Sequence, residues 1–184
     1  MSDTTPPTAQ EPAPPVSIRR DGTVFGFDVG ARRIGVAVGS MFGHHARALA
    51  VIDVHGHGPD WMTLDRLHKE WRPDGLVVGD PLTLEGGSQP ARDRAHAFAR
   101  EVQARYRLPV VLVDERSSSI EAAQRFAGER AEGRKRRRDA QALDAMAAAV
   151  IVERWLAAPD DAIDISRIAP ESDTGISTPP DRPT

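Results

Sequence analysis

Three acidic positions, far apart in the chain, could act together. Asp28 follows one apolar, strand-like run, and Asp114 with Glu115 follows another. Asp144 lies in a segment with the apolar spacing of a helix. Like charges raise one another's pKa, whereas Mg²⁺ or Mn²⁺ prefers such hard oxygen ligands. Two such ions about 4 Å apart activate water and stabilise the leaving oxygen in phosphodiester cleavage. In this interpretation Asp28 bridges two ions, and Glu115 and Asp144 hold one each.

Each acid also has a structural interpretation. An acid that follows a strand, such as Asp28, is often a loop residue or a helix cap. Asp144 can be an ion-paired or half-exposed helix residue, although its same-side neighbours are mostly alanine. These small neighbours predict a helix that packs close to a sheet and holds the carboxylate near the strand ends. The acids alone leave the metal site and the structural roles both open.

A basic run precedes the segment that contains Asp144. It consists of Arg134, Lys135, Arg136, Arg137 and Arg138. Such a run can contact backbone phosphates, an interaction that is sensitive to salt and carries no sequence information. Arg32 and Arg33, in the turn after Asp28, extend the same candidate nucleic-acid surface. The alternative is a solvated loop, because 24 basic and 27 acidic residues give a net charge of −3.

Two further sequence patterns are candidate binding sites. The glycine-rich loop over 80–89, ahead of Pro90, offers backbone amides to a phosphate or is a plain turn. The histidines His44, His45, His55 and His57 have no acidic or cysteine partner at matching spacing. We therefore do not expect a metal site at these histidines.

The order of apolar runs predicts an α/β fold. The expected strands cover 24–27, 34–38, 48–54, 76–79 and 109–113, and the expected helices 60–71, 90–106, 118–127 and 139–156. The first three strands are tightly connected, which favours antiparallel pairing, whereas helical crossovers to the last two favour parallel pairing. We expect a mixed five-stranded sheet flanked by helices over 18–158. Proline-rich composition predicts a disordered tail over 1–17 and a mostly disordered one over 159–184, where isoleucines could still contact the body.

Composition excludes several classes of function. The chain has no cysteine, which excludes disulfides, thiolate metal sites and a cysteine nucleophile. No apolar run reaches the roughly 18 residues of a membrane span, and the first residues do not resemble a secretory signal. We therefore expect a cytoplasmic protein with no membrane partner.

Four motifs in order resemble the YqgF family, also called RuvX-like, of bacterial RNase H-fold proteins. They are the segments 27–38 (FDVGARRIGVAV), 78–86 (VGDPLTLEG), 113–118 (VDERSS) and 144–148 (DAMAA). The resemblance covers roughly 23–156 and leaves out both tails. The chain departs from the family where many members carry an acid after the second strand, here Gly39-Ser40, and where Asn is common, here Thr83.

The resemblance implies an RNase H-like fold and a Mg²⁺- or Mn²⁺-dependent nuclease, a hydrolase of phosphodiester bonds. It places the catalytic, metal-binding acids at Asp28, Glu115 and Asp144. The family is linked to 5′-end maturation of pre-16S rRNA in ribosome biogenesis, with Holliday-junction resolution as the alternative. The expected partners are precursor rRNA or branched DNA and ribosomal particles, and the protein is a monomer or a homodimer.

Two other classes of function are alternatives to a nuclease. A strand-Asp-x-Gly pattern also opens ATP-binding proteins of the actin and sugar-kinase type, but these need two such domains and the body is too short for both. A ribosome-associated binding module without catalysis is the other alternative. All three acids are present, which argues against this loss of catalysis.

Overall fold

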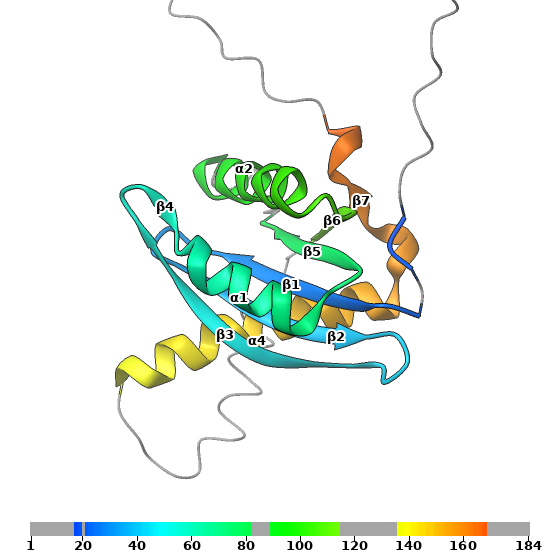
Figure 1. Ribbon diagram of the computed structural model, residues 1–184, viewed down its shortest axis with the longest axis horizontal. Helices are drawn as coiled ribbons and strands as arrows, with labels where there is room; N and C mark the ends of the chain where they lie inside the picture. The colour runs from blue at the N-terminus through cyan, green and yellow to red at the C-terminus, as the bar shows by residue number, and fades with distance from the viewer. Residues whose placement is uncertain (1–16, 20, 82–88, 115–135, 169–184) are drawn as a thin grey trace, which may run out of the picture.

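The computed structural model describes residues 17–19, 21–81, 89–114 and 136–168, without the side chains of 89 and 136–140 (Figure 1). The elements run β1 (Thr23–Val29), β2 (Arg33–Ser40), β3 (His45–His55), β4 (Gly58–Pro59), α1 (Trp61–Trp71), β5 (Gly75–Asp80), α2 (Gln89–Tyr106), β6 (Val110–Asp114), α4 (Arg136–Ala157) and β7 (Ile163–Asp164). Two 3₁₀ turns, Pro159–Asp161 and Ile165–Arg167, flank β7. No helix among the described residues is long and apolar enough to cross a membrane.

One mixed sheet organises the molecule, in the order β4-β3-β2-β1-β5-β6-β7. The short connections make β1, β2 and β3 antiparallel, and the crossovers through α1 and α2 make β5 and β6 parallel to β1. This order and these directions are those of the RNase H-like fold, so the predicted fold class is confirmed. The sheet has seven strands rather than five, because the two-residue strands β4 and β7 add an edge on each side. Strands this short leave no alternation to detect in a sequence.

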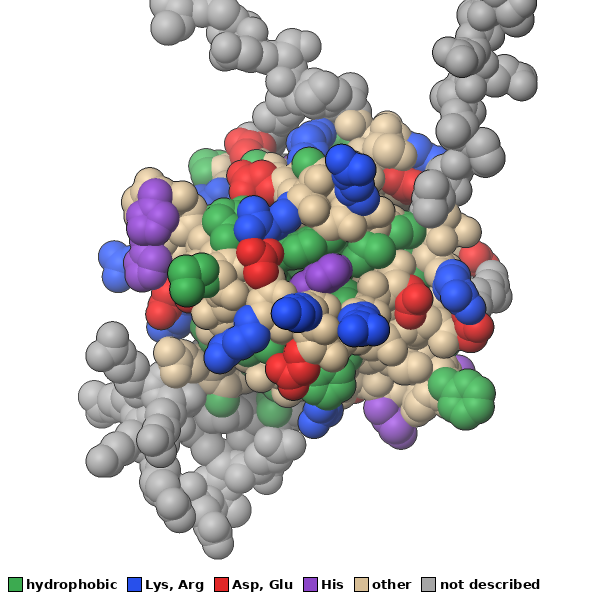
Figure 2. Space-filling view, in the orientation of Figure 1, with side chains coloured by type: hydrophobic (Ala, Val, Ile, Leu, Met, Phe, Trp, Pro, Cys, Tyr) green, Lys and Arg blue, Asp and Glu red, His purple; other side chains and the backbone are tan. Residues whose placement is uncertain are grey.

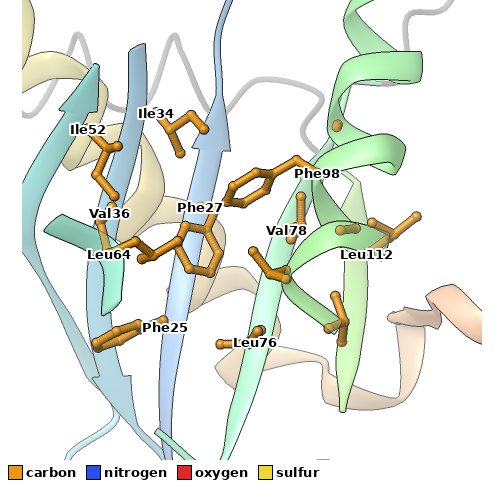
Figure 3. Close-up of a cluster of buried hydrophobic side chains, with 14 of the residues drawn as sticks. Phe25, Phe27, Ile34, Val36, Ile52, Leu64, Leu76, Val78, Phe98 and Leu112 are labelled. Carbon is orange, nitrogen blue, oxygen red and sulfur yellow. The ribbon is translucent and has the colours of Figure 1, made fainter. Parts of the chain in front are cut away.

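Helices cover both faces of the sheet. On one face, Phe25, Phe27 and Val78 pack against Leu64 of α1 and Phe98 of α2 in the larger core (Figure 3). Since side chains alternate along a strand, the residues between these face α4 on the other side. They form a second core with Ile151, Val152 and Trp155. Asp28 continues the set of β1 residues that faces α4.

Glycines let α4 lie unusually close to β1 and β2. A Cβ at Gly35 would overlap the carbonyl oxygen of Asp144, and a Cβ at Gly26 would lie 2.9 Å from the carbonyl oxygen of Ala148. Ala148 is itself fully buried. The predicted close packing of this helix is therefore confirmed, and glycines of the sheet contribute to it as much as alanines of the helix.

The start of the last helix differs from expectation. The last helix begins at Arg136, not Asp139, because arginine favours helices and can extend one beyond its apolar stripe. After Ala158, Ile165 is 1% exposed in the core under α2, so part of this segment contacts the body, as its isoleucines allowed. The expected helix over 118–127 lies outside the described residues.

Candidate active site

Asp28 lies one residue before the end of β1, on the face covered by α4. It pairs with Gly35 across the antiparallel β1–β2 ladder, and directly opposed residues project from the same face of a sheet. Its side chain is half-buried. The missing side chain at Gly35 leaves the space beside Asp28 to the backbone of α4.

Asp144 reaches the same place from α4. Its carbonyl oxygen packs against Gly35, whose Cα is about 5 Å from its cross-strand partner in such a ladder. Asp28 and Asp144 therefore lie on either side of Gly35 on one face of the sheet. The contact between β2 and α4 thus places the backbone of Asp144 against the strand partner of Asp28.

A guanidinium already neutralises Asp144. Arg33 Nε donates to Asp144 Oδ2 at 2.6 Å, and the two side chains are 35% and 30% exposed. Arg33 opens β2, where its carbonyl oxygen accepts a hydrogen bond from the amide of Gly30 at 2.9 Å. The end of β1, the start of β2 and α4 thus form one cluster of two acids and one base, defined here as the β1–β2 acidic cluster of Asp28, Arg33 and Asp144.

The third predicted acid, Glu115, lies outside the described residues. Its neighbour Asp114 ends β6 and pairs with Asp80 of β5 in the parallel ladder. The carbonyl oxygen of Asp114 accepts a hydrogen bond from Arg154 Nη1 of α4 at 3.1 Å. The end of β6 is therefore tied to the helix that carries Asp144.

The predicted basic residues fall into separate groups. Arg32 is exposed in the β1–β2 turn, whereas Arg33 is the partner of Asp144. Arg134 and Lys135 lie outside the described residues. Arg136, Arg137 and Arg138 form the first turn of α4, so the prediction of a loop was wrong for these three. They stand roughly 9–12 Å before Asp144 along the helix axis, at 1.5 Å per residue.

Sequence reasoning missed a buried acid at the end of β5. Asp80 is 3% exposed and accepts hydrogen bonds from Arg92 Nε at 3.0 Å and Arg92 Nη2 at 3.1 Å. His96 Nε2 lies 3.1 Å from Asp80 Oδ1, and it must donate because a carboxylate only accepts. Arg92 and His96 are four residues apart on α2, a spacing that puts both on one face of the helix. That spacing, with an acid ending a buried strand, was the available signal.

The histidine pairs behave as ordinary surface residues. The rings of His55 and His57 stack with centroids 5.6 Å apart at the β3–β4 hairpin. Within the described ranges, no group of three or more His, Cys, Asp or Glu residues could hold a metal ion.

A family model, RuvX, described as a Holliday junction resolvase, matches residues 22–158. This chain belongs to the RuvX family. The family resemblance drawn from the four motifs is confirmed, and the matched range contains the whole β1–β2 acidic cluster.

Two curated relatives carry the same name. A protein of Xanthomonas axonopodis pv. citri (strain 306), named "Putative pre-16S rRNA nuclease", is 78% identical over 146 residues, which are 79% of this chain and 94% of the relative. A relative of Xanthomonas oryzae pv. oryzae (strain PXO99A) with the same name is 77% identical over the same shares.

Among solved structures, T. thermophilus RuvC in complex with a Holliday junction substrate resembles this RuvX-family chain with a TM-score of 0.48. The two are 18% identical, and the match covers 77% of this chain and 98% of that chain. The strand order described above, rather than this likeness, assigns the fold.

Proposed function

We propose that the chain is a metal-dependent endonuclease that hydrolyses phosphodiester bonds during 5′-end maturation of pre-16S rRNA. The observation that carries the proposal is the position of Asp28 and Asp144 on either side of Gly35. Carboxylates on one face at the end of the central strand attract cations, as the Arg33–Asp144 ion pair illustrates, and a divalent ion would find its preferred oxygen ligands there. The names of the relatives favour RNA as the substrate.

The donor set fits a divalent cation. Asp28 and Asp144 offer carboxylate oxygens, the ligands that Mg²⁺ and Mn²⁺ prefer, and the Arg33 ion pair shows that Asp144 attracts positive charge. We assign the third ligand to Glu115, because it follows β6 directly and Val111 and Val113 of β6 pack toward α4.

We assign two roles to residues of the chain, namely metal binding and substrate positioning. A bound divalent ion would lower the pKa of an attacking water and stabilise the leaving oxygen. That ion would be held by the carboxylates of Asp28, Glu115 and Asp144. Arg32 and the arginines of the first turn of α4 would position the strand through its phosphates. The protein would then select its substrate by shape and backbone, with ribosomal particles in the cytoplasm as the setting, as a monomer or homodimer.

The test offers two substrates to purified protein in parallel. One is a precursor 16S rRNA fragment with its 5′ extension, and the other is a four-way DNA junction, each with Mg²⁺ and with chelator. We expect cleavage of the RNA with Mg²⁺, none with chelator, and none by Asp28→Asn. The description of the family model favours the junction as the second candidate, and cleavage of the junction alone would replace the RNA assignment. Binding of RNA without cleavage in Mg²⁺ would replace the enzyme with a binding module.

A further inference from the structure

Arg33 is paired with one of the acids assigned to the metal, whereas Arg32, beside it in the chain, is exposed in the β1–β2 turn. Asp53 stands directly across from Arg33 on β3. The guanidinium nevertheless turns to Asp144, with Nε 2.6 Å from Oδ2. It takes the place at Asp144 that a cation would otherwise take.

The geometry leaves Arg33 able to exchange partners. Its side chain is 35% exposed and that of Asp144 is 30% exposed, so neither charge is locked in the core. Its backbone is fixed at the start of β2 by the hydrogen bond from Gly30, one residue after the exposed Arg32. A guanidinium on a fixed backbone and a long stem can move between a carboxylate and a phosphate, since both accept its bidentate pattern.

We propose that Arg33 couples metal binding to substrate binding. Without metal it pairs with Asp144; a divalent ion displaces it, and the released guanidinium then binds a phosphate of the RNA. Metal and RNA therefore bind cooperatively, each favouring the other by the same factor. The inference rests on the proposed function for the identity of the metal site and of the substrate. It adds a role for Arg33, which pairs with Asp144 in one state and with an RNA phosphate in the other.

The first test measures Mn²⁺ affinity without RNA, by titration followed by electron paramagnetic resonance. Arg33→Met keeps the stem and removes the competing charge, so we expect Mn²⁺ to bind about fivefold more tightly, the equivalent of one half-exposed ion pair. Arg33→Lys restores a competing charge and stays near wild type. Arg66→Met is the control, because it removes an exposed guanidinium from α1 on the opposite face of the sheet, and its affinity stays at the wild-type value.

The second test measures binding of an uncleavable precursor RNA with and without Mn²⁺. We expect Mn²⁺ to strengthen RNA binding in wild type and in Arg66→Met, and to do so less in Arg33→Met. Thermal unfolding of each variant shows that the fold is intact. A residue that only supported the fold would not raise metal affinity when removed.

The outcomes separate this inference from the proposed function. If Asp144→Asn loses Mn²⁺ binding while Arg33→Met binds Mn²⁺ as wild type does, the metal site stands and the role of Arg33 is refuted. If Asp144→Asn binds Mn²⁺ like wild type, the metal site itself is wrong, and the Arg33 inference is lost with it. Unchanged metal–RNA coupling in Arg33→Met also overturns the inference.

Discussion

Among the described residues, Asp80 is a charged side chain that is almost fully buried. Its carboxylate accepts hydrogen bonds from Arg92 and His96, both on α2. Asp80→Asn keeps the shape but turns an amide group toward donors, so at least one donor loses its acceptor. We expect the free energy of unfolding, measured by urea denaturation, to fall by about 2 kcal/mol, as for hydrogen bonds to charged groups.

Glu70→Gln is the control for this substitution. Glu70 is exposed on α1, and the same carboxylate-to-amide change should alter stability by less than about 0.5 kcal/mol. Equal effects of the two substitutions would show that the Asp80 contacts contribute nothing to stability.

Single residues also show which features could not be predicted from the sequence. The positions of Asp28 near the end of a strand and of Asp144 on a helix could be predicted, because apolar runs and helical spacing surround them. The pairing of Arg33 with Asp144 could not be predicted, because it joins the start of β2 to a helix residue 111 positions later in the chain. Such a contact depends on the depth at which α4 docks, which the sequence does not display.

At the scale of elements, the contact between β2 and α4 positions Asp144. Gly35→Ala would place a methyl group onto the Asp144 carbonyl, and backbone cannot move aside as a side chain can. We expect a loss of about 3 kcal/mol in urea denaturation, at the upper end for overpacking, together with loss of cleavage.

Gly43→Ala is the matched control, since a Cβ there meets nothing within 4 Å. Its stability and cleavage should equal those of wild type. If Gly35→Ala behaved in the same way, α4 would not lie where the structure places it.

Helices α1 and α2 are joined by a pH-sensitive contact. Hydrogen bonds from Arg105 and then from Tyr106 hold the pKa of Asp65 below its ordinary value. A depressed carboxyl pKa stabilises the fold above the ordinary value of about 3.9, and this contribution is lost as the pH falls through the folded value. Asp65→Asn should therefore be less stable than wild type by a constant amount from pH 7 to about 5, and the difference should shrink below about pH 4.

Denaturant titrations of both proteins across this range provide the measurement. Tyr106→Phe keeps the Arg105 hydrogen bonds and should retain most of the pH dependence. A difference between wild type and Asp65→Asn that stays constant down to pH 2.5 would contradict the assigned contact.

The elements themselves were largely predictable. Helical spacing from Trp61 to Trp71 gave α1, and Asp60 caps it by accepting from the amide of Thr63 at 3.2 Å. The strand β7 was not predictable, because two residues show no alternation. It pairs with Val111 and Leu112 of β6, and Ile165, which follows it in sequence, is buried in the core.

At the scale of the whole molecule, charge is distributed rather than concentrated. The net charge is −3, and positive and negative side chains are interspersed on the face that carries α1 and α2 (Figure 2). RNA binding should then depend on the arginines that begin α4. Arg137→Gln/Arg138→Gln should weaken RNA binding and reduce the slope of log affinity against log salt by about 1.4, at 0.7 per phosphate contact.

Arg66→Gln/Lys69→Gln removes the same charge from α1, on the opposite face of the sheet. This control should leave the salt slope unchanged. Equal slopes for the two double variants would mean that net charge, rather than the start of α4, attracts the RNA.

The most direct measurement of the central claim is an anomalous diffraction map from crystals soaked in Mn²⁺. The account predicts a manganese peak bound by carboxylate oxygens of Asp28 and Asp144, with Arg33 turned away from Asp144. A Mn²⁺-dependent nuclease whose manganese lies elsewhere, with the Arg33–Asp144 pair intact, would contradict it.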